Sequence, residues 1–216
     1  MAGIKRYRIE HPEWLQVKKD GNFSYGYDQE WYEDAWKRLA GCGPTTATQV
    51  ISYVLFRDGH LPLETVADGD QALVRMNQVW EYVRPRYGGG LYKSTWWEQG
   101  VNQYMADNNL SYNVKRLPIF PLKGSVYTVE EVTAFIQRGL EQNCPVAFLN
   151  RHRGQEEGLS TWHWVPIHKM FMDGDDIRCG IFDEGEGMER TFSLRRWLRD
   201  NLLGGAFLYI QSQCEE

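Results

Sequence analysis

The stretch GCGPTT, at positions 41–46, sets a cysteine between two glycines immediately before a helical pattern of apolar residues. The apolar residues that follow recur at spacings of three and four: Ala47, Val50, Ile51 and Val54. This spacing predicts a helix with a buried face from about residue 45 to residue 56. Pro44 suits the first helical position, because its missing N–H has no helical partner there in any case. We therefore expect Cys42 directly before the N-terminus of a helix.

The position of Cys42 favours a reactive thiol. Unpaired N–H groups at a helix N-terminus stabilise negative charge, and cysteines in such surroundings form the thiolate more readily than free cysteine does. The glycines on either side carry no side chain that would obstruct a substrate. One hypothesis is therefore that Cys42 is a nucleophile. The alternative is a small residue packed at the start of a helix, and this segment alone does not separate the two.

Length and composition narrow the possible functions. The chain has 216 residues, enough for one compact domain with a sizeable core. Its formal charge of -5 argues against a protein built mainly to bind nucleic acid. The polar first ten residues carry no secretory signal, and no apolar run approaches the length of a membrane-spanning helix. Aromatic content is high, with 9 tryptophans and 12 tyrosines; some are expected in the core, and a surplus often lines a cleft.

The cysteines are widely spaced, and no pair of cysteines or of cysteine and histidine has the spacing of a zinc site: Cys42, Cys144, Cys179 and Cys214. We expect reduced thiols and a cytoplasmic protein. Cys144, before Pro145, and Cys179, in an apolar strand, are interpreted as structural thiols. Nothing in the sequence requires a metal or an organic cofactor.

Capping signals and periodicity predict further helices. Asp70 is expected to cap a helix that runs to about residue 83, before Pro85. A second helix is expected to begin at Ser94 or Thr95, where Thr95 and Glu98 have the spacing of a capping box. Thr128 and Glu131 form another such pair before an apolar pattern at helical spacing. A short helix is expected from 193 to 201.

Strands are predicted mainly in the last third of the chain, at 146–149, 162–172, 177–182 and 206–210, with one earlier strand at 111–120 interrupted by Pro118. Helices that precede strands in this way indicate an α+β fold with an antiparallel sheet. We expect a single domain over residues 1–216. Its helical half would span about 1–142, with Cys42 at a helix N-terminus, and would pack on a sheet half of about 143–216.

The predicted hairpin of 162–172 and 177–182 makes it possible to rank two of the five histidines, His163 and His168, as candidates for a catalytic base. A three-residue turn at 173–175 would pair Met172 with Asp176. Strand alternation then places His163 and Asp183 on the apolar face of the hairpin, as diagonal neighbours at one edge and within reach of a hydrogen bond. His168 would lie on the opposite face, beside Arg178. The inference depends on the length of the turn, since a slip of one residue exchanges the two faces.

A histidine beside an aspartate has the arrangement of a general base and its orienting group. The carboxylate fixes the tautomer of the imidazole and stabilises the imidazolium. Taken singly, His163 is better explained as a histidine at the edge of the core, and Asp183 as a turn residue before Gly185. Taken together with Cys42, the three residues are interpreted as a catalytic triad, because a cysteine nucleophile needs a base and an orienter.

Three short motifs occur in the order Cys42-Gly-Pro-Thr, His163-Trp-Val and Phe182-Asp183. In this order the chain resembles the papain-like cysteine peptidases, in particular those of the bacteriocin-processing (double-glycine leader) kind and their bacterial relatives, from about residue 29 to residue 210. Phytochelatin synthase, an acyl transferase, shares the order of the three residues. The resemblance implies a papain-like fold, with a cleft between the helical half that bears Cys42 and the sheet half that bears His163 and Asp183.

The chain departs from the family at one position. The family usually has a glutamine a few residues before the cysteine, as an oxyanion donor, whereas residues 36–40 read WKRLA. Gln29 is the nearest candidate upstream, and the alternative is a surface glutamine. The backbone N–H of Cys42 would be the second donor.

The resemblance implies a cysteine hydrolase that cleaves a peptide or amide bond through an acyl-enzyme. The alternatives are an acyl transferase with the same triad and a non-catalytic module that binds a peptide in the cleft. In each case the expected partner is a peptide or amide, not a nucleic acid or a membrane. The oligomeric state is left open.

Overall fold

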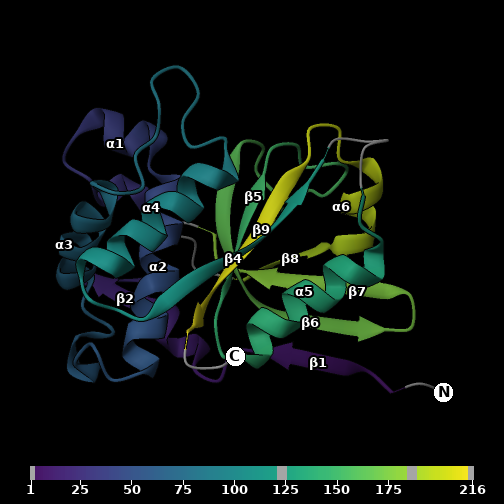
Figure 1. The fold of residues 1–216 in the computed structure, drawn as a ribbon, viewed down its shortest axis with the longest axis horizontal. Helices are drawn as coiled ribbons and strands as arrows, with labels where there is room; N and C mark the ends of the chain where they lie inside the picture. Colours follow the sequence, from purple (N-terminus) through teal and green to yellow (C-terminus); the bar gives the residue numbers. More distant parts are fainter. Residues whose placement is uncertain (1–2, 121–125, 184–188, 214–216) are drawn as a thin grey trace.

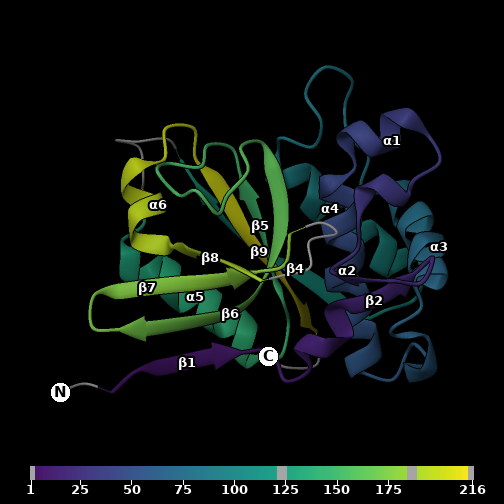
Figure 2. The same ribbon diagram turned by 180° about the vertical axis from the view of Figure 1, so that it is seen from behind.

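The computed structural model describes residues 3–120, 126–183 and 189–213. Helices α1 to α4 gather on one side of the molecule, and the sheet with α5 and α6 forms the other side (Figure 1; Figure 2 from behind). The α-helices of the described residues are α1 Ala35–Ala40, α2 Cys42–Arg57, α3 Gly69–Trp80, α4 Ser94–Asp107, α5 Val129–Glu141 and α6 Leu194–Asp200. Short 3₁₀ helices span Pro12–Leu15, Gln29–Trp31 and Leu63–Thr65. Among the described residues, no helix has the length and apolar character needed to cross a bilayer.

The main sheet has seven strands and is antiparallel throughout. Its order is β4-β9-β5-β6-β7-β8, and β1 also pairs with β6. The strands are β1 Lys5–Arg8, β4 Tyr112–Ile119, β5 Val146–Asn150, β6 His163–Asp173, β7 Asp176–Ile181, β8 Arg190–Ser193 and β9 Gly205–Ser212. A separate hairpin joins β2 Gln16–Lys19 to β3 Asn22–Tyr25. The predicted α+β class with an antiparallel sheet is confirmed.

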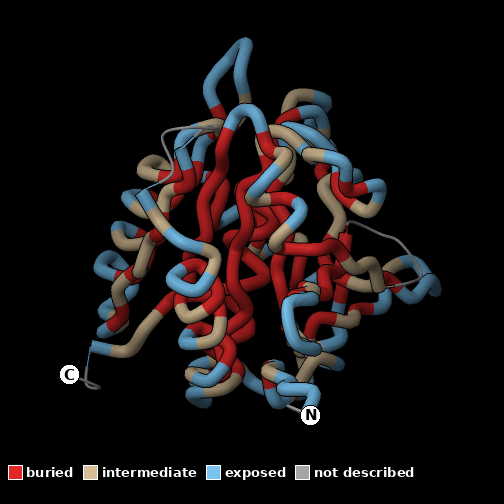
Figure 3. Tube along the Cα trace, turned by 90° about the vertical axis from the view of Figure 1, so that its right-hand side faces the viewer, coloured by how far each residue is buried: buried red, intermediate tan, exposed pale blue. Residues whose placement is uncertain are grey.

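Helix α2 is the central element of the helical side. Every residue from 43 to 56 is buried, and the helix packs against α3, α4 and β6. Figure 3 shows the buried chain concentrated in the middle of the molecule, with exposed segments around it. The predicted helix is confirmed, but it begins at Cys42 itself, with Gly41 as the N-cap, so that Pro44 is the third helical residue and not the first.

The main hydrophobic cluster joins the two sides. It contains Val50 and Val54 of α2, Trp97 of α4 and Phe148 of β5. Helix α5 covers one face of the sheet through contacts with β1, β5, β6 and β9. The helical and sheet segments therefore share a core, in which α2 packs against β6.

Two predicted helix caps are wrong and one is confirmed. Asp68, not Asp70, caps α3, because its carboxylate accepts the backbone N–H groups of Asp70 and Gln71. Helix α4 begins at Ser94 without a side-chain cap, and Thr95 lies inside it. The box at Thr128 is present: Glu131 N–H lies 3.2 Å from Thr128 Oγ1, and Thr128 N–H lies 2.7 Å from Glu131 Oε2.

Pro118 lies inside β4 instead of interrupting it. Within the described residues, strand β4 pairs only with β9 and is an edge strand, where a missing N–H donor is tolerated.

The hairpin of β6 and β7 corrects the predicted turn. Asp173 pairs with Asp176, so the turn has two residues and not three. A β-bulge follows between Ile167 and Lys169, and His168 is the extra residue. Beyond the bulge Ile167 pairs with Ile181, which is the predicted register. The shorter turn shifts the pairing by one residue relative to the prediction, and the bulge shifts it back by one. The end of the hairpin that carries His163 therefore has the predicted pairing.

The bulge also changes which residues face the core. Unbroken alternation from His163 would put Lys169 and Phe171 on the apolar face with it. Both are instead half-buried, whereas Met170 between them is buried. Arg178 pairs with Phe171, so His168 does not lie beside it. His168 is instead 3 % exposed and stacks on Phe182, with ring centroids 4.1 Å apart. The prediction for His168 is therefore wrong, and the cause is the bulge.

Candidate active site

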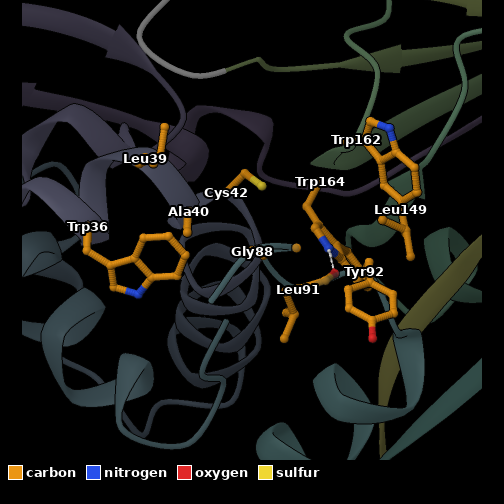
Figure 4. A pocket seen from close by; sticks show the side chains of 12 residues that line it. Trp36, Leu39, Ala40, Cys42, Gly88, Leu91, Tyr92, Leu149, Trp162 and Trp164 are labelled. Carbon is orange, nitrogen blue, oxygen red and sulfur yellow. Dashed lines mark hydrogen bonds between the residues drawn. The ribbon is translucent and has the colours of Figure 1, made fainter. Parts of the chain in front are cut away.

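Cys42 lines a cleft of about 750 Å³ between the helical side and the sheet. It is the first residue of α2 and is partly exposed. Figure 4 shows its sulfur pointing into the space between Leu39 and Ala40 on one side and Trp162 and Trp164 on the other. The remaining lining residues are Trp36, Gly88, Gly89, Gly90, Leu91, Tyr92 and Leu149. The thiol thus lies at the N-terminus of a buried helix and is open to a ligand from the cleft.

His163 and Asp183 form the predicted hydrogen bond. His163 Nε2 lies 2.7 Å from Asp183 Oδ1. His163 is the first residue of β6, and Asp183 follows the end of β7. Their side chains are 14 % and 8 % exposed, so the bond is largely shielded from water. A charge-assisted bond in such surroundings holds the imidazole in one orientation.

Arg190 is a member of this cluster that sequence reasoning missed. Its Nη1 lies 3.2 Å from Asp183 Oδ2, while Oδ1 of the same carboxylate contacts His163. Arg190 is the first residue of β8, which pairs with β7. The guanidinium thus holds the second oxygen of the carboxylate and helps to fix its plane. Arg190 could have been identified only if the pairing of β8 with β7 had been predicted. Strand β8 has four residues with one apolar position, so the sequence does not reveal it as a strand.

The cleft brings the cysteine and the histidine to the same region from different elements. Trp162 and Trp164, on either side of His163 in the chain, both line the cleft that Cys42 lines. Helix α2 packs directly against β6. The sequence separates the two residues by more than half the chain, and the shared core joins them.

The two glycines beside Cys42 serve close packing. A Cβ atom on Gly43 would lie 2.5 Å from Leu91 Cδ2, and one on Gly41 would collide with the carbonyl oxygen of Lys37. The carbonyl of Leu91 in turn accepts a 2.8 Å hydrogen bond from Trp164 Nε1. These contacts link three elements around the cleft: α2 through Gly43, the loop before α4 through Leu91, and β6 through Trp164. The sequence suggests only that the glycines leave room for a substrate, and it does not reveal that they allow this close packing.

Gln29 lies against the residue that precedes Cys42. Its Cβ is 3.0 Å from the position that a Cβ on Gly41 would take. The intervening residues form a 3₁₀ turn and the short helix α1, which bring Gln29 back to the start of α2. Its Oε1 is buried and has no hydrogen-bond partner within the described part of the chain. Several other side chains share this property, for example Gln49 and Gln142, so the unpaired oxygen by itself assigns no role to Gln29.

Trp162 has a strained backbone. Its φ angle is +57°, in the left-handed region that favours glycine, and its side chain is 54 % exposed at the rim of the cleft. A non-glycine residue in such a conformation costs about 1–3 kcal/mol and persists where function or the surrounding structure requires it. The residue directly before the candidate base is thus held at an energetic cost.

The other described cysteines are not candidates for this chemistry. Cys144 and Cys179 are fully buried and free. Burial raises the pKa of the Cys144 thiol to about 12 and also raises the pKa of Cys179. Their interpretation as structural thiols agrees with this, because the thiol form predominates at neutral pH. Cys214 and Gly185 lie outside the described residues.

The described residues contain no group of three or more His, Cys, Asp or Glu side chains arranged to hold a metal ion. Comparison of the sequence with models of protein families and with curated proteins gave no match.

Proposed function

We propose that this protein is a cysteine hydrolase that cleaves a peptide or amide bond, with Cys42, His163 and Asp183 as its catalytic triad. The observation that carries the proposal is the 2.7 Å bond between His163 and Asp183 beside the cleft that Cys42 lines. A base and its orienter near a thiol at a helix N-terminus are the parts that nucleophilic catalysis by cysteine requires.

The proposed reaction has two stages. His163 accepts the proton of the Cys42 thiol, and the thiolate attacks the substrate carbonyl. His163 then donates that proton to the departing amine, and a thioester joins the acyl group to Cys42. In the second stage His163 deprotonates a water molecule, which attacks the thioester and releases the acid and the thiol. Asp183 stabilises the imidazolium in both stages.

Gln29 is the proposed second donor to the oxyanion, together with the backbone N–H of Cys42. Its position against Gly41 supports this role. The loss of one such donor reduces turnover by about 10²- to 10³-fold.

A papain-like arrangement is part of the proposal. It is supported by the helical side that carries Cys42, the antiparallel sheet that carries His163 and Asp183, and the cleft between them. We also propose the cytoplasm as the place of action, because the nucleophile must stay a free thiol and the cytoplasm keeps thiols reduced.

The test is a peptide library digested by the wild-type protein and by Cys42→Ala, with the products read by mass spectrometry. Cleavage that Cys42→Ala lacks, while its urea unfolding midpoint stays within error of wild type, supports the proposal. Cleavage that persists in this variant contradicts it. A product that carries an added amine in place of water would identify acyl transfer instead.

A second readout does not need a substrate. Iodoacetamide at pH 6 reacts slowly with an ordinary thiol, because only a small fraction is ionised there. We expect Cys42 to be labelled faster in the folded protein than in urea, and His163→Ala to remove this difference. Equal labelling of Cys42 in the folded and unfolded protein would argue for the non-catalytic alternative.

A further inference from the structure

Trp162 differs from the other tryptophans of the chain. The other eight belong to a hydrophobic cluster of the described residues or pack against one. Trp162 is not among these buried and partly buried residues, and it is 54 % exposed at the rim of the cleft. Its indole therefore adds little to the stability of the fold.

The backbone conformation of Trp162 is also one that a tryptophan rarely adopts. At a φ of +57° a glycine would be unstrained, and asparagine would be tolerated. A large side chain that is strained, exposed and outside the core is poorly explained by folding. Strain of this kind concentrates at sites that bind or react with ligands.

Leu39 is the counterpart of Trp162 on the helical side. It lies in α1 and is 77 % exposed, although it lines the same cleft. In Figure 4, Leu39 and Trp162 lie on opposite sides of Cys42 at the rim. Two exposed apolar side chains thus flank the thiol from two different elements.

Among the described residues, the lining of the cleft contains no Asp, Glu, Lys, Arg or His side chain. Its twelve residues are tryptophans, glycines, leucines, an alanine, a tyrosine and Cys42. A charged group that entered this cleft would lose its hydration without gaining a partner from the lining. An uncharged apolar group would bury its own surface together with the exposed surfaces of Leu39 and Trp162.

We propose that Leu39 and Trp162 bind an uncharged, aromatic or large aliphatic side chain of a peptide, next to the carbonyl that Cys42 would attack. The position of that carbonyl rests on the proposed function, whereas the binding of the side chain does not. Trp162 is then a specificity-determining residue, and the strain in its backbone serves to hold the indole at the rim.

The experiment uses full-length protein with Cys42→Ala, so that binding is measured without chemistry. The probes are three blocked peptides, acetyl-Ala-Phe-Ala-amide, acetyl-Ala-Gly-Ala-amide and acetyl-Ala-Asp-Ala-amide, titrated by NMR. We expect the phenylalanine peptide to bind at least tenfold more tightly than the other two. Adding Trp162→Gly should remove this preference and raise the urea midpoint of unfolding, because the strain is released.

Two further variants complete the test. Leu39→Ala should weaken the phenylalanine peptide several-fold. Phe23→Ala, at an aromatic residue that is 66 % exposed and does not line the cleft, is the matched control and should leave binding unchanged. The proposal is overturned if the phenylalanine peptide has no advantage, if Trp162→Gly keeps that advantage, or if Trp162→Gly lowers the urea midpoint, which would identify a structural residue.

The outcomes separate this proposal from the previous one. Loss of the phenylalanine preference in Trp162→Gly would support the binding site even if the wild-type protein cleaved no peptide. Conversely, cleavage that depends on Cys42 but shows no preference for apolar residues would leave the hydrolase proposal intact and refute this one.

Discussion

His163 Nε2 contacts Asp183 Oδ1 at 2.7 Å although the turn that joins their strands is one residue shorter than the sequence predicts. The bulge at His168 compensates for the short turn, so that the pairing between Ile167 and Ile181 agrees with the predicted register. A β-bulge commonly re-aims side chains near a functional site. Here it allows the strand end at His163 and the segment after β7 to meet.

Asp183→Asn should reduce turnover by about 10²- to 10⁴-fold while leaving the unfolding midpoint nearly unchanged. The amide keeps the size of the carboxylate but does not stabilise the imidazolium and no longer selects its tautomer. The measurement is kcat/KM on any peptide that wild type cleaves. Asp176→Asn, at the exposed first residue of β7 in the same hairpin, is the control and should retain full activity. Wild-type turnover in Asp183→Asn would exclude Asp183 from the reaction.

Arg190→Ala should lower turnover by about tenfold, less than Asp183→Asn, because Arg190 acts on the reaction through its contact with Asp183. Arg190→Lys should restore part of the loss, since a lysine keeps the charge but not the planar geometry. Arg178→Ala is the matched control, because that arginine contacts Thr191 at 3.4 Å. The readout is the pH profile of kcat/KM, which should change in Arg190→Ala but not in Arg178→Ala. A parallel loss in both variants would indicate a general weakening of the sheet edge.

The stability of the fold should decrease on mild acidification because of His168. Burial lowers the pKa of this histidine below its usual 6.5, although Glu189, whose Oε2 lies 3.1 Å from Nε2, opposes the shift. The folded state thus favours the neutral ring. As the pH falls from about 6.5 towards the lower pKa of the folded state, the unfolded chain takes up the proton first and the free energy of unfolding decreases.

Urea denaturation at pH 7.5 and at pH 5.5 measures this effect. His168→Phe keeps the ring that stacks on Phe182 and removes the titration, so the variant should lose most of the difference between the two pH values. His60→Phe, at an exposed histidine, is the control and should behave as wild type. An unchanged pH dependence in His168→Phe would assign the effect to other groups, such as the neighbouring Glu189 or Lys169.

Gly43→Ala should destabilise the fold by about 1–3 kcal/mol, because the new methyl group would overlap Leu91. It should also lower activity, since Leu91 holds Trp164 below the thiol. Leu91→Ala in the Gly43→Ala background should recover part of the stability, whereas Leu91→Ala alone should destabilise. Gly3→Ala, where a Cβ would meet no atom within 4 Å, is the control for the substitution itself. Independent, additive effects of the two substitutions would refute the contact.

The sequence predicts the helices well where their signals are local. The apolar spacing after Cys42 and the box formed by Thr128 and Glu131 each depend on residues within one or two turns. The erroneous cap at Asp70 differs by two residues from the true cap at Asp68, because both aspartates precede the same apolar pattern. Local signals thus establish that an element exists more reliably than they establish where it begins.

Features that depend on pairing between distant segments could not be read in the same way. The bulge lies in a run of five consecutive buried residues, 164–168, where alternation is not visible. Strand β1, with the sequence KRYR, is recognisable only through its pairing with β6. Arg190 and the backbone of Trp162 likewise depend on tertiary context. The site prediction succeeded for the contact between His163 and Asp183 because two shifts in register offset each other.

The contacts between Gly43, Leu91 and Trp164 have a consequence for ligand binding. They join the beginning of a buried helix, a loop and a central strand at the base of the cleft, so these walls are already in place before any ligand arrives. A preorganised site loses little conformational entropy on association. Affinity should therefore depend on how well a ligand fits the existing shape of the cleft. A closing movement of these walls should contribute little to the binding of any ligand.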